Sequence, residues 1–395
     1  MITDTKDRHY MRAALRLAAR GVGQASPNPA VGCVVVRNGR IVGQGWHRYA
    51  DRDHAEIGAL RQAGTRARGG TAYVTLEPCS HQGRTPPCVA ALVQAGVRRV
   101  VAAMIDPNPE VCGSGFDRLR HAGLQVEVGL FRMEALRLNE PFACYATTGR
   151  PLIVAKAGMS LDGRIATAAG ETRWITSAEA REFGQGLRRE LDAILVGVGT
   201  ILADDPALTY RGLGAKDRPL VRAVLDSRLR TPIDARLFRE AAPLVIFCRP
   251  EAPSRPRRLL EKAGAEVIPV PRVTGGLDLD PVIAELARRK VLGLLVEGGS
   301  EIHWSFISRQ LTDKFYFILA PLVLGGKQSV PSIGGAGFKT IASAPRFKIT
   351  RNFPVGSDLV LEAYPQYSRS MASPWLASET PPSGGLDSFP ASTRR

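Results

Sequence analysis

One histidine, one glutamate and two cysteines stand at spacings that suit a catalytic zinc site. His54-Ala55-Glu56 places a carboxylate two residues from an imidazole, and Cys79 and Cys88 add two thiols. Three protein ligands leave the fourth tetrahedral position of zinc open for water, and the metal lowers the pKa of that water toward roughly 7. If Glu56 stays off the metal, it can carry protons between the water and a substrate nitrogen.

This pattern is similar to the signature of zinc-dependent base deaminases, which is H-x-E followed by P-C and a second cysteine. The short form has two residues between the cysteines, whereas eight separate Cys79 from Cys88. A loop containing Gly83, Pro86 and Pro87 can still return both sulfurs to one metal. The apolar run after Pro87 predicts a helix beginning at Cys88, and a helix N-terminus favours the thiolate that zinc requires. The alternative is two unrelated buried cysteines and a surface histidine.

The surrounding elements must bring these residues together. A first helix is expected from Asp4 or Thr5 to Gly21, and Asn38-Gly39 predicts a hairpin over 31–42. Further helices are expected from about 54, from 88, over 116–121 and over 134–139, with strands over 72–76, 99–105 and 124–128. Helices that alternate with strands imply a layered α/β sheet. His54 and Cys88 would then open neighbouring helices at strand ends, where the sites of open α/β sheets lie.

Several residues near the candidate zinc site have two interpretations. Asn28, in Ser26-Pro27-Asn28-Pro29, either presents its amide to the edge of a heterocycle or forms an ordinary Asx turn. His47, His81 and His121 compete as metal ligands. His81 either touches substrate or is solvated. A structural zinc would need a fourth protein ligand, which only His47 or His81 could supply.

Composition narrows the class of protein. A chain of 395 residues suggests two or three domains, and no apolar run is long enough to span a membrane. The charged N-terminus does not resemble a secretory signal, and six scattered cysteines suit a reducing compartment, so the cytoplasm is expected. A formal charge of +16 fits nucleic-acid binding or pockets for phosphorylated small molecules. Since arginine is spread without a basic tract, the second interpretation is preferred.

The second half again alternates strands and helices. Strands are expected over 152–156, 193–196, 220–225, 244–247, 266–270 and 292–296, and helices over 177–191, 278–290 and 301–308. Later strands, over 315–323, 347–352 and 358–364, read as an antiparallel edge. Gly197-x-Gly199 fails as a dinucleotide fingerprint because Leu202 takes the third glycine position. Glu297-Gly298-Gly299-Ser300 is either a phosphate cradle or a common Gly-Gly turn before a helix. The polar segment 147–151 reads as a domain boundary.

Taken together, the two halves resemble the bifunctional deaminase-reductases of riboflavin biosynthesis. His54-Ala55-Glu56 and the segment from Pro78-Cys79-Ser80-His81 to Cys88 look like the family's zinc site. Ser160-Leu161-Asp162-Gly163, Trp174-Ile175-Thr176, the segment 202–209 and Glu297-Gly298-Gly299 look like its reductase motifs. The resemblance implies an α/β chain: a cytidine-deaminase-like α/β/α layered domain over 1–148, a dihydrofolate-reductase-like α/β domain over 149–366, and a disordered tail over 367–395.

The same resemblance implies two consecutive steps on one phosphorylated pyrimidine. Zinc held by His54, Cys79 and Cys88 would activate water against the ring carbon that bears the 2-amino group of a diaminopyrimidinone, while Glu56 carries the proton to the departing ammonia. NADPH would then deliver hydride to the sugar C1′, turning a ribosylamino into a ribitylamino group. The expected cofactors are Zn²⁺ and NADPH. The expected partner is the small-molecule substrate, with no nucleic acid and no membrane, in a homo-oligomer.

Residue-by-residue matching to the family also implies binding positions in the second domain. Those expected to border the nicotinamide cofactor are Gly158, Trp174, Thr200, Asp204, Ser227, Gly299, Ser300, Glu301, Ile302, His303, Trp304 and Ser305. Those expected to hold substrate are Thr172, Arg188, Leu208, Arg211 and Glu297. The arginines suit a 5′-phosphate, which calls for bidentate cationic donors. Thr172 stands where the family often has serine.

Two other classes share part of this pattern. A nucleic-acid editing deaminase would have the same zinc site and would suit the basic charge, but it would not need a second domain with a phosphate cradle. A binding protein with structural zinc would need a closed, four-ligand site.

Overall fold

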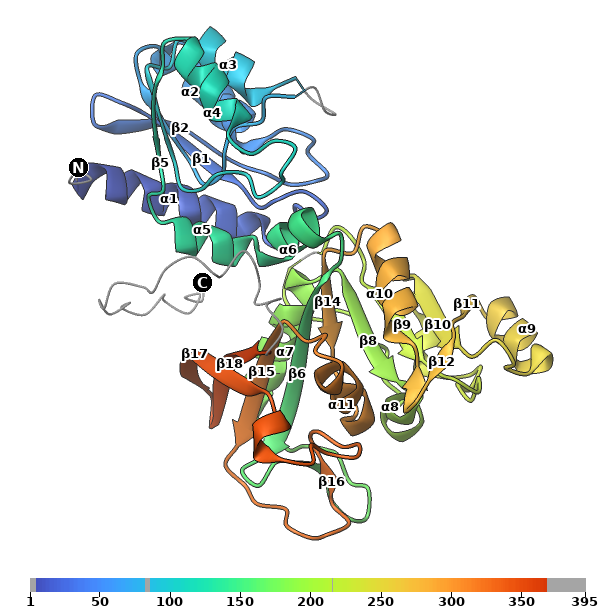
Figure 1. Ribbon diagram of the computed structural model, residues 1–395. Helices are drawn as coiled ribbons and strands as arrows, with labels where there is room; N and C mark the ends of the chain where they lie inside the picture. The colour runs from blue at the N-terminus through green and yellow to red at the C-terminus, as the bar shows by residue number, and fades with distance from the viewer. Residues whose placement is uncertain (1–4, 82–85, 215, 368–395) are drawn as a thin grey trace.

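The computed structural model describes residues 5–81, 86–214 and 216–367, which form two sheets, each covered by helices, one above the other (Figure 1). The N-terminal sheet has five strands in the order β2-β1-β3-β4-β5. Its elements are α1 (Thr5–Gly21), β1 (Gly32–Arg37), β2 (Arg40–Trp46), α2 (Ala55–Ala63), β3 (Thr71–Val74), α3 (Cys88–Gln94), β4 (Arg99–Ala102), α4 (Ser114–His121), β5 (Gln125–Val128), α5 (Arg132–Leu138) and α6 (Glu140–Thr148).

Close backbone packing fixes α2 against the N-terminal sheet. A Cβ atom at Gly45 of β2 would collide with the carbonyl oxygen of Ala55, the first residue of α2. One turn further along, a Cβ at Gly43 would collide with the carbonyl of Ala59. Only glycine permits this approach of strand to helix. The beginning of α2, next to His54, is therefore held at a defined height over the sheet.

The C-terminal sheet has nine strands in the order β11-β10-β9-β8-β14-β6-β15-β18-β17. Its main elements are β6 (Leu152–Ser160), α7 (Ala178–Glu190), β8 (Ala193–Gly197), α8 (Val198–Asp204), β9 (Val221–Leu225), β10 (Leu244–Cys248), α9 (Ser254–Lys262), β11 (Glu266–Pro269), α10 (Leu279–Arg288), β14 (Gly293–Val296), α11 (Ser300–Ser308), β15 (Lys314–Ala320), β17 (Arg346–Val355) and β18 (Asp358–Gln366). Short strands form two small ribbons: β7 (Arg164–Ala166) with β16 (Val330–Pro331), and β12 (Arg272–Val273) with β13 (Gly276–Leu277).

Strand direction in this sheet follows the apolar pattern. Every residue of β8, β9 and β10 is buried, as expected of parallel strands covered on both faces. In the sheet order, the strands from β11 to β15 run parallel to one another, whereas β18 pairs antiparallel with both β15 and β17. The expected antiparallel edge is confirmed. In contrast, no residue of β17 is fully buried, which suits its place at the outer edge.

Three helices were not anticipated from the sequence. Residues 140–148, expected as a link into a polar boundary, form α6, because Pro141 stands in the first turn, where its missing N–H costs nothing, and Gly149 ends the helix at φ 73°. Residues 198–204 form α8, where two glycines obscured the helical pattern. Residues 254–262 form α9, a largely polar helix whose buried residue is Leu260.

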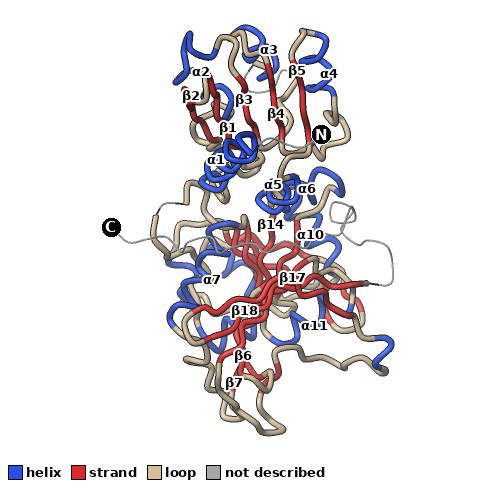
Figure 2. The backbone as a smooth tube through the Cα atoms, turned by 90° about the vertical axis from the view of Figure 1, so that its left-hand side faces the viewer, coloured by secondary structure: helices blue, strands red, loops and turns tan. Residues whose placement is uncertain are grey.

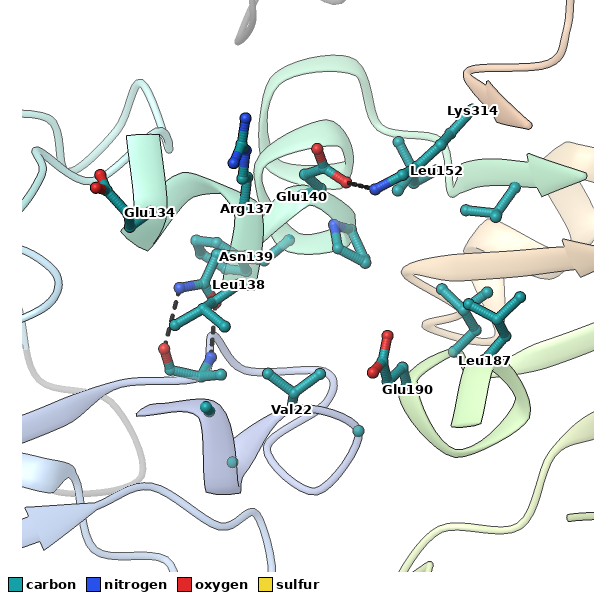
Figure 3. A pocket seen from close by; sticks show the side chains of 18 of the residues that line it. Val22, Glu134, Arg137, Leu138, Asn139, Glu140, Leu152, Leu187, Glu190 and Lys314 are labelled. Carbon is teal, nitrogen blue, oxygen red and sulfur yellow. Dashed lines mark hydrogen bonds and ion pairs between the residues drawn. The ribbon is translucent and has the colours of Figure 1, made fainter. Parts of the chain in front are cut away.

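The two halves meet around α5 and α6, which lie between the sheets in both views (Figures 1 and 2). Lys314 of β15 donates to Glu140 of α6 at 2.9 Å, and the Tyr364 hydroxyl donates to the same carboxylate at 2.5 Å. A cavity of about 1380 Å³ lies beside this contact (Figure 3) and reaches Leu152, at the beginning of β6. On another side of the cavity, the side chain of Asn139 accepts a hydrogen bond from the N–H of Ala30 and donates one to the carbonyl of Ala30.

Within the described residues, no helix combines the length and the apolar character needed to cross a lipid bilayer.

Candidate functional site

Two helix starts and one loop bring the predicted zinc ligands together. His54 caps α2, Cys88 opens α3, and Cys79 lies in the loop after β3. His54 Nδ1 lies 3.2 Å from Cys88 Sγ and 3.5 Å from Cys79 Sγ, and all three ligand atoms lie within 4.8 Å of one another. Bond lengths of about 2.0 Å to nitrogen and 2.3 Å to sulfur place tetrahedral zinc ligands roughly 3.5 Å apart. The donor set and its spacing therefore fit one zinc ion.

None of the three competing histidines belongs to the ligand group found among the described residues. The amide Nδ2 of Asn28 lies 3.0 Å from His47 Nε2, and His47 Nδ1 lies 2.7 Å from the carbonyl of Asp53. His81 is exposed, and His121 bonds through Nδ1 to the carbonyl of Asp117 in its own helix. Within the described part of the chain, the ligand group consists of His54, Cys79 and Cys88. A fourth position is thus left for water or substrate.

The pKa shifts in the cluster distinguish Cys79, a metal ligand, from Glu56, a proton carrier. Glu56 is only 4% exposed. Its burial, reinforced by the charge of Cys79, raises the pKa of Glu56 to about 7. The hydrogen bond from Cys88 lowers the pKa of Cys79, with His54 also contributing, against the opposing effect of burial. A carboxyl that can hold or release a proton near neutral pH stands beside a sulfur that is readily ionised.

Glu77 is a positioning residue that sequence reasoning missed. Its carboxylate accepts hydrogen bonds from the backbone N–H groups of Asp106, Gly113 and Gly115 at 3.1, 2.9 and 2.8 Å. These bonds tie the loop before α4 to the strand end that leads into Cys79. A carboxylate directly before Pro-Cys was the available signal, but its partners come from a loop that only the fold brings near. Gln82 to Thr85, part of the predicted motif, lie outside the described residues.

A second cluster of charged groups lies in the C-terminal half. Arg188 of α7 binds Glu297 through two hydrogen bonds, from Nε at 2.8 Å and from Nη2 at 2.9 Å, and its Nη1 donates to the carbonyl of Thr209. Lys156 of β6 places Nζ 3.5 Å from Glu297 Oε2. Burial disfavours the charge of Glu297, but Arg188 and Lys156 outweigh it and lower its pKa to about 2. Lys156 lay inside an apolar strand pattern and was not predicted as a site residue.

The positions expected to border the cofactor gather at the carboxyl ends of parallel strands, where ligands of such sheets bind. Gly158 lies in β6, Thr200 in α8, Ser227 after β9 and Gly299 before α11. A Cβ at Gly158 would lie 2.9 Å from Cγ2 of Thr176, so this wall admits no larger residue. The hydroxyl of Ser300, at the N-terminus of α11, is buried without a hydrogen-bond partner among the described residues. An open backbone edge and an unpaired hydroxyl suit a phosphate-bearing cofactor.

Other predicted residues differ in how they face this edge. Thr172 donates to the Asp204 carboxylate at 2.7 Å, so a substrate candidate and a cofactor candidate are in contact. Trp174 is 68% exposed and Arg181 lies 4.2 Å from its ring centre. The side chain of Leu208 is buried at φ 55°, which leaves its backbone for any contact with substrate.

The remaining predicted positions divide between core and surface. His303 is buried and its Nδ1 bonds to the carbonyl of Ser332. Ile302 packs against Gly197, and the Trp304 ring packs against Phe338. Glu301 and Arg211 are exposed, whereas Ser305 is half-buried. In the segment from Gly299 to Ser305, the N-terminal backbone and the Ser300 hydroxyl are therefore better placed to contact a ligand than the other side chains are.

Two protein families match the chain. Residues 4–104 match the family described as "Cytidine and deoxycytidylate deaminase zinc-binding region", and residues 151–361 match the "RibD C-terminal domain". Among curated proteins, the chain is 41% identical to the riboflavin biosynthesis protein RibD of Aquifex aeolicus over 90% of this chain and 97% of that protein. It is 42% identical to RibD of Escherichia coli over 90% of this chain and 98% of that protein.

Solved structures agree with the sequence matches. RibD of Acinetobacter baumannii superposes with a TM-score of 0.83 at 36% identity, covering 92% of this chain and 99% of that structure. A Thermotoga maritima deaminase/reductase superposes with a TM-score of 0.81 at 32% identity, covering 91% of this chain and 99% of that structure. Both domain types are therefore present in one chain, in the order and over the length seen in these relatives. The chain belongs to the RibD family of zinc- and NADPH-dependent bifunctional enzymes of riboflavin biosynthesis, which act as deaminase and reductase.

Proposed function

We propose that residues 1–148 hydrolytically deaminate 2,5-diamino-6-(5-phosphoribosylamino)pyrimidin-4(3H)-one, and that residues 149–366 reduce the product with NADPH to 5-amino-6-(5-phosphoribitylamino)uracil. The name of the Thermotoga maritima relative describes both activities. The observation that supports the first step most strongly is the three-ligand cluster of His54, Cys79 and Cys88 with the buried Glu56 beside it. Zinc bound by these ligands would supply a Lewis acid that lowers the pKa of water.

In the first step, Glu56 moves the proton. Its carboxylate takes a proton from the attacking water and passes it to the amino nitrogen, which leaves as ammonia while the ring carbon gains oxygen. A pKa near neutrality suits a group that must accept and then donate at physiological pH. Asn28, held by His47 at 3.0 Å, orients the pyrimidine edge with its amide.

In the second step, NADPH when bound supplies the hydride for the sugar C1′. The C1′–O bond of the ring opens, and the ring oxygen must gain a proton. Lys156 is the proposed donor because its ammonium lies beside the ionised Glu297, within the strand that also carries Gly158. Glu297 holds this ammonium in place, and Arg188 holds Glu297.

The 5′-phosphate is assigned mainly to Arg211. Two nitrogens of Arg188 are committed to Glu297 and the third to a backbone carbonyl, which limits its capacity for phosphate. Arg211 is exposed, and among the described residues only its backbone N–H is engaged, with Gln185 at 2.8 Å. Thr172 and the backbone at Leu208 complete the proposed substrate wall. We also propose a cytoplasmic, homo-oligomeric enzyme, to be checked by cell fractionation and by light scattering of the purified protein.

The test is to incubate the purified protein with the diaminopyrimidine ribosyl phosphate, with and without NADPH, and to weigh the products. Without NADPH, the expected product is the deaminated ribosyl compound plus ammonia; with NADPH, it is the ribityl compound. Glu56→Gln should stop both products from appearing but should still reduce deaminated substrate supplied to it. Glu261→Gln, at an exposed position of α9, is the matched control and should behave as wild type. NADPH oxidation with dihydrofolate in place of the pyrimidine would contradict the substrate assignment.

A further inference from the structure

Two neighbouring strand ends in the C-terminal sheet are followed by arginines that no step of the proposed reaction uses. Arg228 follows β9 by three residues, and Arg249 directly follows β10. The two parallel strands are paired up to Leu225 and Phe247, and beyond this pair the N–H of Arg249 donates to the carbonyl of Ser227 at 3.3 Å. Arg249 is thus the cross-strand neighbour of Ser227, one of the positions expected to border the cofactor. Figure 1 shows β9 and β10 side by side.

The strand order gives the direction in which a bound dinucleotide must extend. Gly158 lies in β6, the Gly299 turn follows β14, Thr200 follows β8, and Ser227 follows β9, and these four strands are consecutive in the sheet. Three strand spacings separate β6 from β9, which is about 14 Å. The hydride-donating end must lie near Lys156 and Glu297, at β6 and β14. The other end, the adenosine, therefore reaches β9 and β10.

The charges at β9 and β10 are unpaired. Among the described residues, the side chains of Arg228 and Arg249 have neither a hydrogen bond nor an ion pair, and the Nε of Arg249 is buried without a partner. The Nε of Arg257, in α9, is likewise buried and unpaired, and its Nη2 lies 3.5 Å from the sulfur of Cys248. By contrast, Arg188 binds a carboxylate through two nitrogens. Cationic groups left without an acid at a ligand-binding edge suit an anion supplied by the ligand.

The nearest acid, Asp226, is enclosed in its own turn, where its Oδ1 is buried without a hydrogen-bond partner among the described residues. Asp226 is fully buried, and its Oδ2 accepts hydrogen bonds from the N–H and the hydroxyl of Thr231 at 2.7 and 2.8 Å. It holds the turn that presents Arg228. In dinucleotide sites, an acid facing the ribose accepts its 2′-hydroxyl and favours NAD, whereas an arginine accommodates the 2′-phosphate of NADP. This edge carries the second arrangement.

We propose that Arg249, with Arg228 on the adjacent turn, binds the 2′-phosphate of NADPH and makes the enzyme select NADPH over NADH. The proposal rests on the proposed function, since it takes the nicotinamide end to lie at β6 and β14. A guanidinium can donate two parallel hydrogen bonds to phosphate, which a 2′-hydroxyl cannot use in the same way. Loss of one such contact should weaken binding of the phosphorylated dinucleotide about 10- to 100-fold.

The experiment measures equilibrium binding of NADP⁺ and NAD⁺ by calorimetry, together with the fragments 2′,5′-ADP and 5′-AMP, on the full chain without substrate. For Arg249→Gln, the dissociation constant of NADP⁺ and of 2′,5′-ADP should rise about 10- to 100-fold, while those of NAD⁺ and 5′-AMP should stay within about twofold. Arg249→Lys keeps the charge and should lose less. Arg16→Gln, at an exposed position of α1 in the N-terminal half, removes the same charge away from β9 and β10 and should change neither dissociation constant.

Three results would overturn the inference. If wild-type protein binds NADP⁺ and NAD⁺ equally, no residue of the protein recognises the 2′-phosphate. A variant Arg249→Gln with unchanged NADP⁺ preference, also when combined with Arg228→Gln, would place the selection elsewhere. Equal weakening of NADP⁺ and NAD⁺ would make Arg249 a structural residue. Wild-type protein that binds neither dinucleotide would instead remove the reductase proposal itself, so the two failures are distinguishable.

Discussion

Replacing Arg188 by methionine tests whether the second charged cluster is built around Glu297. The side chains of Arg188 and Glu297 are each 11% exposed, so the change leaves a buried carboxylate with only Lys156 at 3.5 Å. Removing one partner of a buried ion pair costs about 3–5 kcal/mol of folding free energy. The pKa of Glu297 leads to a similar figure, because a carboxyl shifted from 4.5 to about 2 is stabilised by about 3 kcal/mol at neutral pH.

The pH dependence follows from the same shift. The folded-state pKa of Glu297 lies below its unfolded value, so the stabilisation is complete above about pH 4.5 and is lost as the pH falls toward 2. The difference in unfolding free energy between wild type and Arg188→Met should therefore be largest at pH 6–8 and shrink below about pH 4.5. Urea unfolding followed by circular dichroism measures it, and ammonia release at each urea concentration reports the deaminase part separately.

A double variant separates stability from catalysis. Arg188→Met with Glu297→Leu removes both charges, and replacing a buried pair by apolar groups is often neutral or stabilising. We expect most of the lost folding free energy to return, whereas reduction by NADPH should be absent in both the single and the double variant and ammonia release should stay normal. If the single variant loses less than about 1 kcal/mol, or if the double variant reduces substrate as wild type does, the role given to this pair is wrong.

Three further predictions concern the zinc site and the contact between the halves. Glu56→Gln should keep about one zinc per chain by metal analysis while ammonia release falls at least 100-fold, consistent with loss of a general acid-base group; normal ammonia release would exclude Glu56 from proton transfer. Asn28→Ala should retain zinc but raise the KM for deamination about 10-fold, as expected for one lost hydrogen bond, and an unchanged KM would make Asn28 a turn residue. Lys314→Met should cost about 3–5 kcal/mol in urea unfolding because Glu140 and Glu362 stay buried without their cation. Burial opposes the Lys314 charge, but Glu140 raises its pKa well above 10.5, so this cost should be constant from pH 6 to 9 and decline only above about 10.5; a cost that changes within that range would contradict the assignment.

The zinc site could be predicted because each ligand stands at a boundary with a local signal. His54 precedes a helix, and Cys88 follows Pro87 at the start of another, so short-range sequence already placed both at element ends. The antiparallel edge of the second sheet could also be predicted, because no long helix separates the last two strands.

The residues that were missed depend on contacts between distant segments. Lys156 sits inside an apolar strand, and its importance appears only because β14 pairs with β6 and places Glu297 beside it. Glu77 acts through the backbone of a loop about thirty residues later, which no local pattern connects to it. The helix α6 was missed because the preceding helix was expected to end at 139 and lead into a polar boundary, although the first turn of a helix tolerates Pro141.

The docking of the N-terminal half onto the beginning of β6 has a consequence for the order of events. Leu152 lies at the junction of the two halves, whereas Gly158 and Ser160 lie at the opposite end of a strand of nine residues. At about 3.3 Å per residue, the strand is roughly 30 Å long. A newly deaminated molecule must cover at least that span along the outside of its own chain. Capture by a neighbouring chain, or dilution into the surrounding water, therefore competes with the reduction step of each turnover.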